Sequence, residues 1–381
     1  MAPGVPRHMP QLLERASLRR STGVLVSLLL PVSVAAQTKS AADIDAYVRP
    51  LVKANQFSGV VLASSNGTIL YEKPFGSAQA EWGVPNRPST VFGIASITKP
   101  MTTTIALRLI DEGKLGRQDP VSKWLPDFPK GDQITVEMLM IHRSGLPHRG
   151  TTPVEESLRY TAADMVEKAR RVPLVFQPGE RELYSSLGYS VLARVLELAA
   201  ARSFAQLLKE YVFDPAGMKD STDFNGEALL PRRAQEYFLE PSGWVHPPLK
   251  DYSFLVGAGS VFSTARDVFR FGDAVVNGRY GENVRRQLVE EGEFADNGDS
   301  NGFRCYVDVN GAKHYGFVVV SNLHRCQRFA RACPVQHPAG QTRLSPEPSH
   351  SHLQETACGA APGVCRRLQI PEVHEQSHPR G

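Results

Sequence analysis

One serine and one lysine have the spacing of a nucleophile and its base. Ser96 and Lys99 lie in Phe92-Gly-Ile-Ala-Ser-Ile-Thr-Lys-Pro100, and Ser-x-x-Lys occurs only once in the chain. Pro100 is typical of the first turn of a helix, where residues three apart lie about 5–6 Å apart at Cβ. A lysine that loses its proton can activate a serine hydroxyl, and the N–H groups of a helix start can hold an oxyanion. The pattern predicts covalent acyl transfer; the alternative is a helix cap with an exposed lysine.

The surrounding segments predict an α+β fold that would position this pair. Residues 41–52 have an amphipathic helical pattern, and two β-rich runs, 57–63 and 68–72, flank Asn66-Gly67. Asn-Gly between such runs is a strong hairpin signal. Helical periodicity then dominates from residue 100 to about 239. We therefore expect an antiparallel sheet flanked by helices, with an all-helical lobe inserted into it.

Composition excludes several classes of protein. The chain has 381 residues, of which 41% are hydrophobic and 22% charged, which is ordinary for a folded protein. A net charge of +4 leaves no basic stripe for nucleic acid. Four of the five cysteines lie in the last 56 residues, so the main body has no disulfide framework.

The N-terminus has the pattern of a secretory signal peptide. Arg15, Arg19 and Arg20 precede an apolar run over residues 23–36, and Val-Ala-Ala ends this run before Gln37. We expect a signal peptide over residues 1–36, a secreted or periplasmic product, and no membrane association after cleavage. The alternative is a retained membrane anchor, although 14 residues interrupted by a proline are short against the about 20 that span a bilayer.

Several further segments follow the nucleophile motif in a recognisable order. They are Ile110-Asp-Glu-Gly-Lys-Leu, the run from Ile134-Thr-Val to His142-Arg-Ser-Gly-Leu146, and Phe176-Gln-Pro-Gly. Together they resemble the serine β-lactamase and penicillin-binding-protein superfamily, specifically its class C-like branch. The resemblance implies a β-lactamase/transpeptidase-like fold and a serine hydrolase that acts without cofactor or metal. Its substrate would be a small-molecule or peptide ester, amide or β-lactam, attacked by Ser96 with Lys99 as proton carrier.

The family's second motif, Tyr-x-Asn, is only partly matched. Tyr184-Ser-Ser186 retains the tyrosine but has serine in place of asparagine. The resemblance implies that Tyr184 shares the proton transfer, as a phenolate or relay if Lys99 lowers its pKa. Ser186 would contact the substrate with one hydroxyl instead of an amide.

The family's third motif lies on the strand beside the nucleophile and is usually Lys or His, any residue, then Gly. Lys313-His-Tyr-Gly316 offers His314 and Gly316 as substrate-binding residues. A second register remains open, in which Tyr315-Gly316 precedes the motif and its histidine is replaced by Phe317. His142 is interpreted as a buried structural histidine, and His374-Glu-Gln-Ser-His378 as a chance match to a zinc motif.

The resemblance ends after Gly316. Residues 317–381 contain no Lys, Asp, Tyr or Trp but six of the 11 histidines and seven prolines. We therefore expect a hydrolase domain over residues 37–316, incomplete at its C-terminus, and an atypical tail over 317–381 that is disordered or comes from a shifted reading frame or a grafted end. The alternative function is that of a non-catalytic or defective relative that serves as a binding or scaffold protein. The sequence assigns no oligomeric state.

Overall fold

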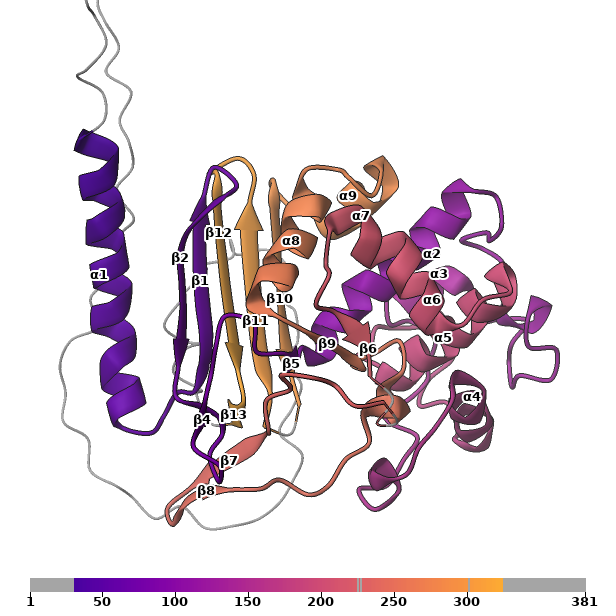
Figure 1. The fold of residues 1–381 in the computed structure, drawn as a ribbon. Helices are drawn as coiled ribbons and strands as arrows, with labels where there is room; N and C mark the ends of the chain where they lie inside the picture. Colours follow the sequence, from indigo (N-terminus) through magenta and orange to yellow (C-terminus); the bar gives the residue numbers. More distant parts are fainter. Residues whose placement is uncertain (1–30, 225, 227, 301, 325–381) are drawn as a thin grey trace, which may run out of the picture. The chain divides into compact units, whose positions relative to one another are not determined.

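The predicted antiparallel sheet is confirmed, and it has five strands. The computed structural model describes residues 31–224, 226, 228–300 and 302–324. The strands lie in the order β10-β11-β12-β1-β2, and each neighbouring pair is antiparallel (Figure 1). At the predicted hairpin, Asn66 and Gly67 have φ of 50° and 72°, the left-handed pair that a two-residue turn requires. The bounds are β1 (Gly59–Ser65), β2 (Thr68–Phe75), β10 (Glu293–Asp299), β11 (Arg304–Asn310) and β12 (Tyr315–Ser321).

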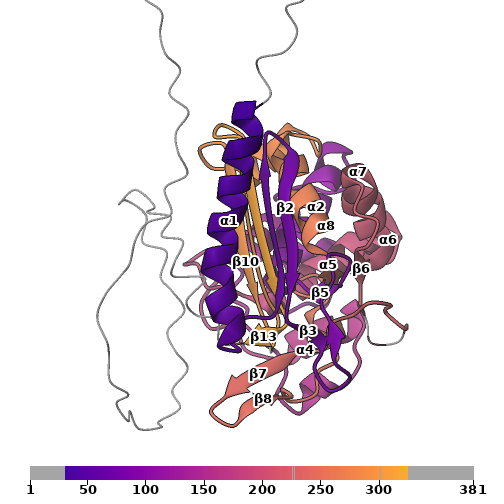
Figure 2. The same cartoon turned by 60° about the vertical axis from the view of Figure 1, so that its left-hand side comes forward.

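Helix α1 (Pro31–Lys53) covers one face of the sheet, beside β1 and β2 (Figure 2). Its Val48 packs in a small apolar cluster with Val61 and Val319 of the strands. Asp45 ties the same helix to β2, because it accepts hydrogen bonds from the Tyr71 hydroxyl (2.7 Å) and from Lys73. The helix predicted over 41–52 is therefore present and begins earlier than expected.

Helix α8 (Ala265–Val276) covers the opposite face, against β11 and β12. Thr264 begins it as a cap, with its hydroxyl accepting from the Asp267 N–H (3.2 Å). Gly272 allows close packing, since a Cβ there would lie 2.8 Å from Val309 on the sheet.

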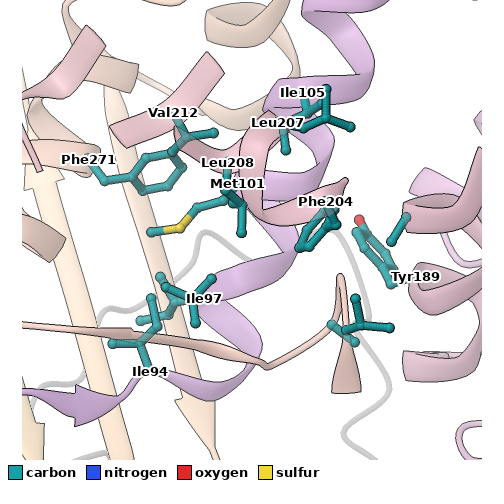
Figure 3. Close-up of a cluster of buried hydrophobic side chains, with 14 of the residues drawn as sticks. Ile94, Ile97, Met101, Ile105, Tyr189, Phe204, Leu207, Leu208, Val212 and Phe271 are labelled. Carbon is teal, nitrogen blue, oxygen red and sulfur yellow. The ribbon is translucent and has the colours of Figure 1, made fainter. Parts of the chain in front are cut away.

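The predicted helical lobe lies between the short strands β5 (Phe92–Gly93) and β9 (Val261–Ser263), which pair with each other. Helix α2 runs through its core, where Met101 and Ile105 lie among Leu207, Leu208 and Val212 (Figure 3). The helices of the lobe are α2 (Thr98–Asp111), α3 (Val136–Met140), α4 (Ala162–Arg171), α5 (Ser186–Ala200), α6 (Phe204–Leu208) and α7 (Asp214–Ala216), and α9 (Glu282–Leu288) follows α8.

Short strands complete the sheet lobe. They are β3 (Ser77–Gln79), β4 (Val84–Pro85), β6 (Thr222–Asp223), β7 (Tyr237–Glu240), β8 (Gly243–Val245) and β13 (Leu323–His324). Strand β6 pairs with β9, and β13 pairs with β7.

The predicted domain boundary after Gly316 is wrong, because it falls inside β12. Residues 317–321 pair on one side with β11 and on the other with β1. Strand β13 then extends the domain to His324. The predicted tail beyond it, and the signal peptide up to residue 30, lie outside the described residues. Within the part that is described, no helix is both long and apolar enough to cross a bilayer.

Candidate active site

Ser96 lies in a tight turn, Ala95–Ile97, that leads directly into α2. Ala95 has φ of 48°, a left-handed conformation that costs energy for a residue with a Cβ. The turn is held against β9, because Ile94 donates its N–H to the carbonyl of Val261 (3.0 Å). The serine is thus presented at a helix start, as predicted.

Lys99 lies one turn further on and is 4% exposed. Its Nζ lies 3.2 Å from the Ser96 Oγ and donates to the carbonyl of Ala258 (2.9 Å). Burial lowers the Lys99 pKa to about 7, the nearby charge of Asp296 opposes this shift, and Arg149 adds to it. Near neutral pH this lysine can therefore exchange a proton.

Tyr184 reaches the same serine from a loop 88 residues away in the sequence. Its hydroxyl donates to the Ser96 Oγ at 2.7 Å, and the Lys99 Nζ lies 4.6 Å from its ring centroid. Although 42% of the residue is exposed, its hydroxyl faces Ser96, and burial raises the tyrosine pKa to about 12. The condition for a phenolate role, a pKa lowered by Lys99, is not met, so near neutral pH Tyr184 is a protonated donor and Lys99 is the better base.

The loop 142–148 supports the segment that carries Tyr184. Ser186 begins α5, is buried, and donates its N–H to the carbonyl of His148 (3.1 Å). His142 accepts at Nδ1 from the Ser185 N–H (3.1 Å), and burial lowers its pKa to about 3. This histidine is therefore a neutral acceptor, as interpreted. The substrate contact of Ser186 stays a prediction.

His314 and Gly316 do not belong to this site, and their assignment to the third motif is wrong. His314 lies in the turn between β11 and β12, where its carbonyl accepts from the N–H of Asn66 (2.8 Å). The strand that contacts Ser96 is β10, and its Gly298 pairs with Cys305 of β11. The turn that carries His314 begins after Asn310, about five residues further along β11. At about 3.4 Å per residue, this turn lies roughly 17 Å from Gly298.

The strand beside the nucleophile is β10, and Gly298 makes the contact. A Cβ at Gly298 would lie 2.0 Å from the carbonyl oxygen of Ile94 and 3.2 Å from the Ser96 nitrogen. Ser300 donates its N–H to the carbonyl of Phe303, on the β11 side of the strand (3.0 Å). Successive N–H groups of a strand point in opposite directions, so the Asp299 N–H points away from β11, toward the free edge of the sheet. The sequence motifs did not identify β10 as the strand beside the nucleophile.

Asp296 takes the position in which the family's third motif has a cation, two residues before that glycine. Its carboxylate accepts from the Asn297 N–H (2.7 Å). Its charge raises the pKa values of both Lys99 and Tyr184, which places it within electrostatic reach of the two groups. The local field is therefore negative on the β10 side.

No group of three metal-ligating side chains lies together in the described parts of the chain. The side chains that converge on Ser96 are a lysine and a tyrosine, and the backbone nitrogen of Ser96 lies in the turn beside β10. This set suits acyl transfer by a serine, which needs a base and donors for an oxyanion.

The fold and the Ser-x-x-Lys turn define the class of penicillin-binding-protein-like serine hydrolases. A family model described as Beta-lactamase matches residues 44–332, and the chain belongs to this family. It is 32% identical over 268 residues to a putative penicillin-binding protein PbpX from Bacillus subtilis, covering 70% of this chain and 66% of that protein. It is 34% identical over 199 residues to esterase EstB from Burkholderia gladioli, covering 47% of this chain and 50% of that protein. The matches thus span about half to two thirds of these relatives.

The fold is also shared with solved structures. D-amino acid amidase from Ochrobactrum anthropi SV3, complexed with D-phenylalanine, superposes with a TM-score of 0.66 at 21% identity, covering 76% of this chain and 92% of that one. At this identity the similarity establishes the fold alone.

Proposed function

We propose that this protein hydrolyses a carboxylic ester or amide through an acyl-enzyme on Ser96. The observation that carries the proposal is the convergence of two proton-carrying groups on one oxygen: Lys99 Nζ at 3.2 Å and Tyr184 hydroxyl at 2.7 Å from the Ser96 Oγ. Convergence of a buried lysine and a tyrosine on a serine at a strained turn is costly for a purely structural site.

The steps follow from the charges of these groups. Neutral Lys99 removes the Ser96 proton as Oγ attacks the carbonyl carbon, and the Ser96 and Asp299 N–H groups stabilise the oxyanion. Tyr184 donates its proton to the departing alcohol or amine and regains one from Lys99. Water then attacks the acyl-enzyme by the same route in reverse, releasing the acid and restoring Ser96.

The substrate we propose is an ester or amide without a carboxylate next to the scissile bond. One relative is described as an esterase. The negative charge of Asp296, on the β10 side of the site, repels an anionic substrate and favours a cationic one. Penicillins should therefore be poorer substrates than a neutral ester.

Covalent labelling tests the proposal. Wild-type protein incubated with a fluorophosphonate should gain one adduct by intact mass, mapped to the peptide that contains Ser96, and should hydrolyse p-nitrophenyl acetate. Ser96→Ala should do neither, while Ser157→Ala, a change at an exposed serine outside the site, should behave as wild type. Hydrolysis that survives in Ser96→Ala would refute the assignment, and absence of labelling in the wild type would favour a binding or scaffold role.

We also propose that the enzyme acts outside the cytoplasm after removal of residues 1–36. Cleavage after Ala36 would remove residues 31–36 from the start of α1 and leave residues 37–53 of this helix on the sheet. N-terminal sequencing of protein recovered from the periplasm or medium checks this: a first residue other than Gln37 or its near neighbours would contradict the predicted cleavage site.

A further inference from the structure

His142 contacts the chain on both sides of Tyr184. Its carbonyl oxygen accepts from the N–H of Leu183 (2.9 Å), and its Nδ1 accepts from the N–H of Ser185 (3.1 Å). One residue therefore holds a backbone N–H on each side of the tyrosine, at Leu183 and at Ser185. The carbonyl bond is available to any residue type, whereas the second bond needs a side-chain acceptor.

The ring of the same histidine also limits the position of the tyrosine ring. Its centroid lies 4.6 Å from that of Tyr184 and 5.1 Å from that of the buried Tyr189. Tyr189 is itself fixed, because its hydroxyl donates to the carbonyl of Met140 (2.8 Å). The stack thus connects Tyr184 to the core of the helical lobe.

The backbone at this position restricts which residues can do this. His142 has φ of 60°, in the left-handed region where glycine is free, asparagine is tolerated and most other residues are strained. The conformation turns the side chain back toward residues 184 and 185. A histidine here combines a tolerated backbone, a short acceptor and an aromatic face.

We propose that His142 is a positioning residue that fixes the Tyr184 hydroxyl on the Ser96 Oγ. The proposal rests on the proposed function, because it assigns Tyr184 to the acylation step. In this scheme His142 does not exchange a proton with substrate. It holds Tyr184 in place through the hydrogen bond to the Ser185 N–H and through ring packing. Loss of the acceptor leaves the Ser185 N–H without this partner and allows residues 183–185 to shift. A shift of about 1 Å at a reacting group can cost roughly 100-fold in rate.

Two variants at this position form a matched pair. Both His142→Asn and His142→Gly suit the left-handed backbone, but only asparagine places an acceptor atom where Nδ1 lies. His142→Asn should retain the acylation rate with p-nitrophenyl acetate to within about fivefold, whereas His142→Gly should lose about 10- to 100-fold in that rate. The substrate concentration that gives half of the maximal acylation rate should change little in either, because in this scheme the histidine acts on Tyr184 and not on substrate.

A double variant separates positioning from general damage to the fold. The Tyr184→Phe variant has no hydroxyl to position. Adding His142→Gly to it should therefore lower the acylation rate by less than about threefold. A large additional loss there, or equal rates for His142→Gly and His142→Asn, would overturn the proposal. Thermal unfolding of each variant checks that it is folded. Failure of the wild type to acylate at all would instead refute the proposed function.

Discussion

The protonation of Lys99 should set the lower limb of the pH–rate profile. A lysine acts as a base only when neutral, and burial lowers the pKa of Lys99 to about 7 from its ordinary value of 10.5. About a tenth of the molecules have a neutral lysine at pH 6 and about nine tenths at pH 8. The rate constant kcat/KM for p-nitrophenyl acetate should therefore rise about tenfold between these values and then level off.

An ordinary lysine gives a very different profile. With a pKa of 10.5 only about 0.3% would be neutral at pH 8, and the rate would still rise about tenfold per pH unit up to pH 10. Stopped-flow measurement of ester hydrolysis between pH 5 and 10, with the rate of Ser96→Ala subtracted at each pH, distinguishes the two cases. A midpoint above about 9, or a flat profile, would refute the role of burial at Lys99.

Asp296 gives an independent check on the same group. Its negative charge raises the Lys99 pKa, so Asp296→Asn should move the midpoint of the profile to lower pH. The sign matters, because a shift to higher pH would mean that the carboxylate does not act on the lysine through charge. Lys99→Arg is the matched control, since arginine stays protonated throughout this range, and it should cost about 10²–10⁴ in rate at every pH.

Three further outcomes follow from the geometry. Gly298→Ala should abolish labelling of Ser96, because a Cβ would lie 2.0 Å from the Ile94 carbonyl and displace β10; retained labelling would contradict the contact. Tyr184→Phe should slow acylation by about 10- to 1,000-fold without preventing the labelling of Ser96, as measured in single turnovers. Burial and then Glu293 raise the pKa of Asp308 to about 6, so its ionisation costs stability as pH rises from about 4 to 6. Asp308→Asn should raise the free energy of unfolding by up to about 3 kcal/mol at pH 8 and leave it unchanged at pH 4, in urea titrations.

The sequence predicted the parts of the site that depend on local spacing. Ser96 and Lys99 are three residues apart at a helix start, so helix geometry alone brings them together. Tyr184 has no such local signal, because it reaches the serine across 88 residues, and only the family resemblance indicated it. The phenolate role that the sequence left open for it is not favoured, because burial raises its pKa.

The strand beside the nucleophile could not be located from a sequence motif. Residues 293–321 form three consecutive strands, and any of them could have lain beside the nucleophile. The order of strands decides this, and β10 is the edge that reaches Ser96. A search for a cationic residue two positions before a glycine selects His314, whereas β10, the strand beside Ser96, has Asp296 at that position. Position in a sheet is set by long-range pairing, which a three-residue pattern does not encode.

Composition also misplaced the end of the domain, for a physical reason. The five residues 317–321 that complete β12 are Phe, three Val and Ser, as suits a central strand that is buried on both faces and rich in β-branched residues, so the absence of Lys and Asp there does not mark the end of the domain. The run Val318-Val319-Val320 of β12 is at most 7% exposed. Burying three such side chains stabilises a fold by about 5–9 kcal/mol, as much as the whole stability of many domains. Because β12 lies between β11 and β1, it also joins the strand pair beside Ser96 to the N-terminal hairpin, and the active site depends on it.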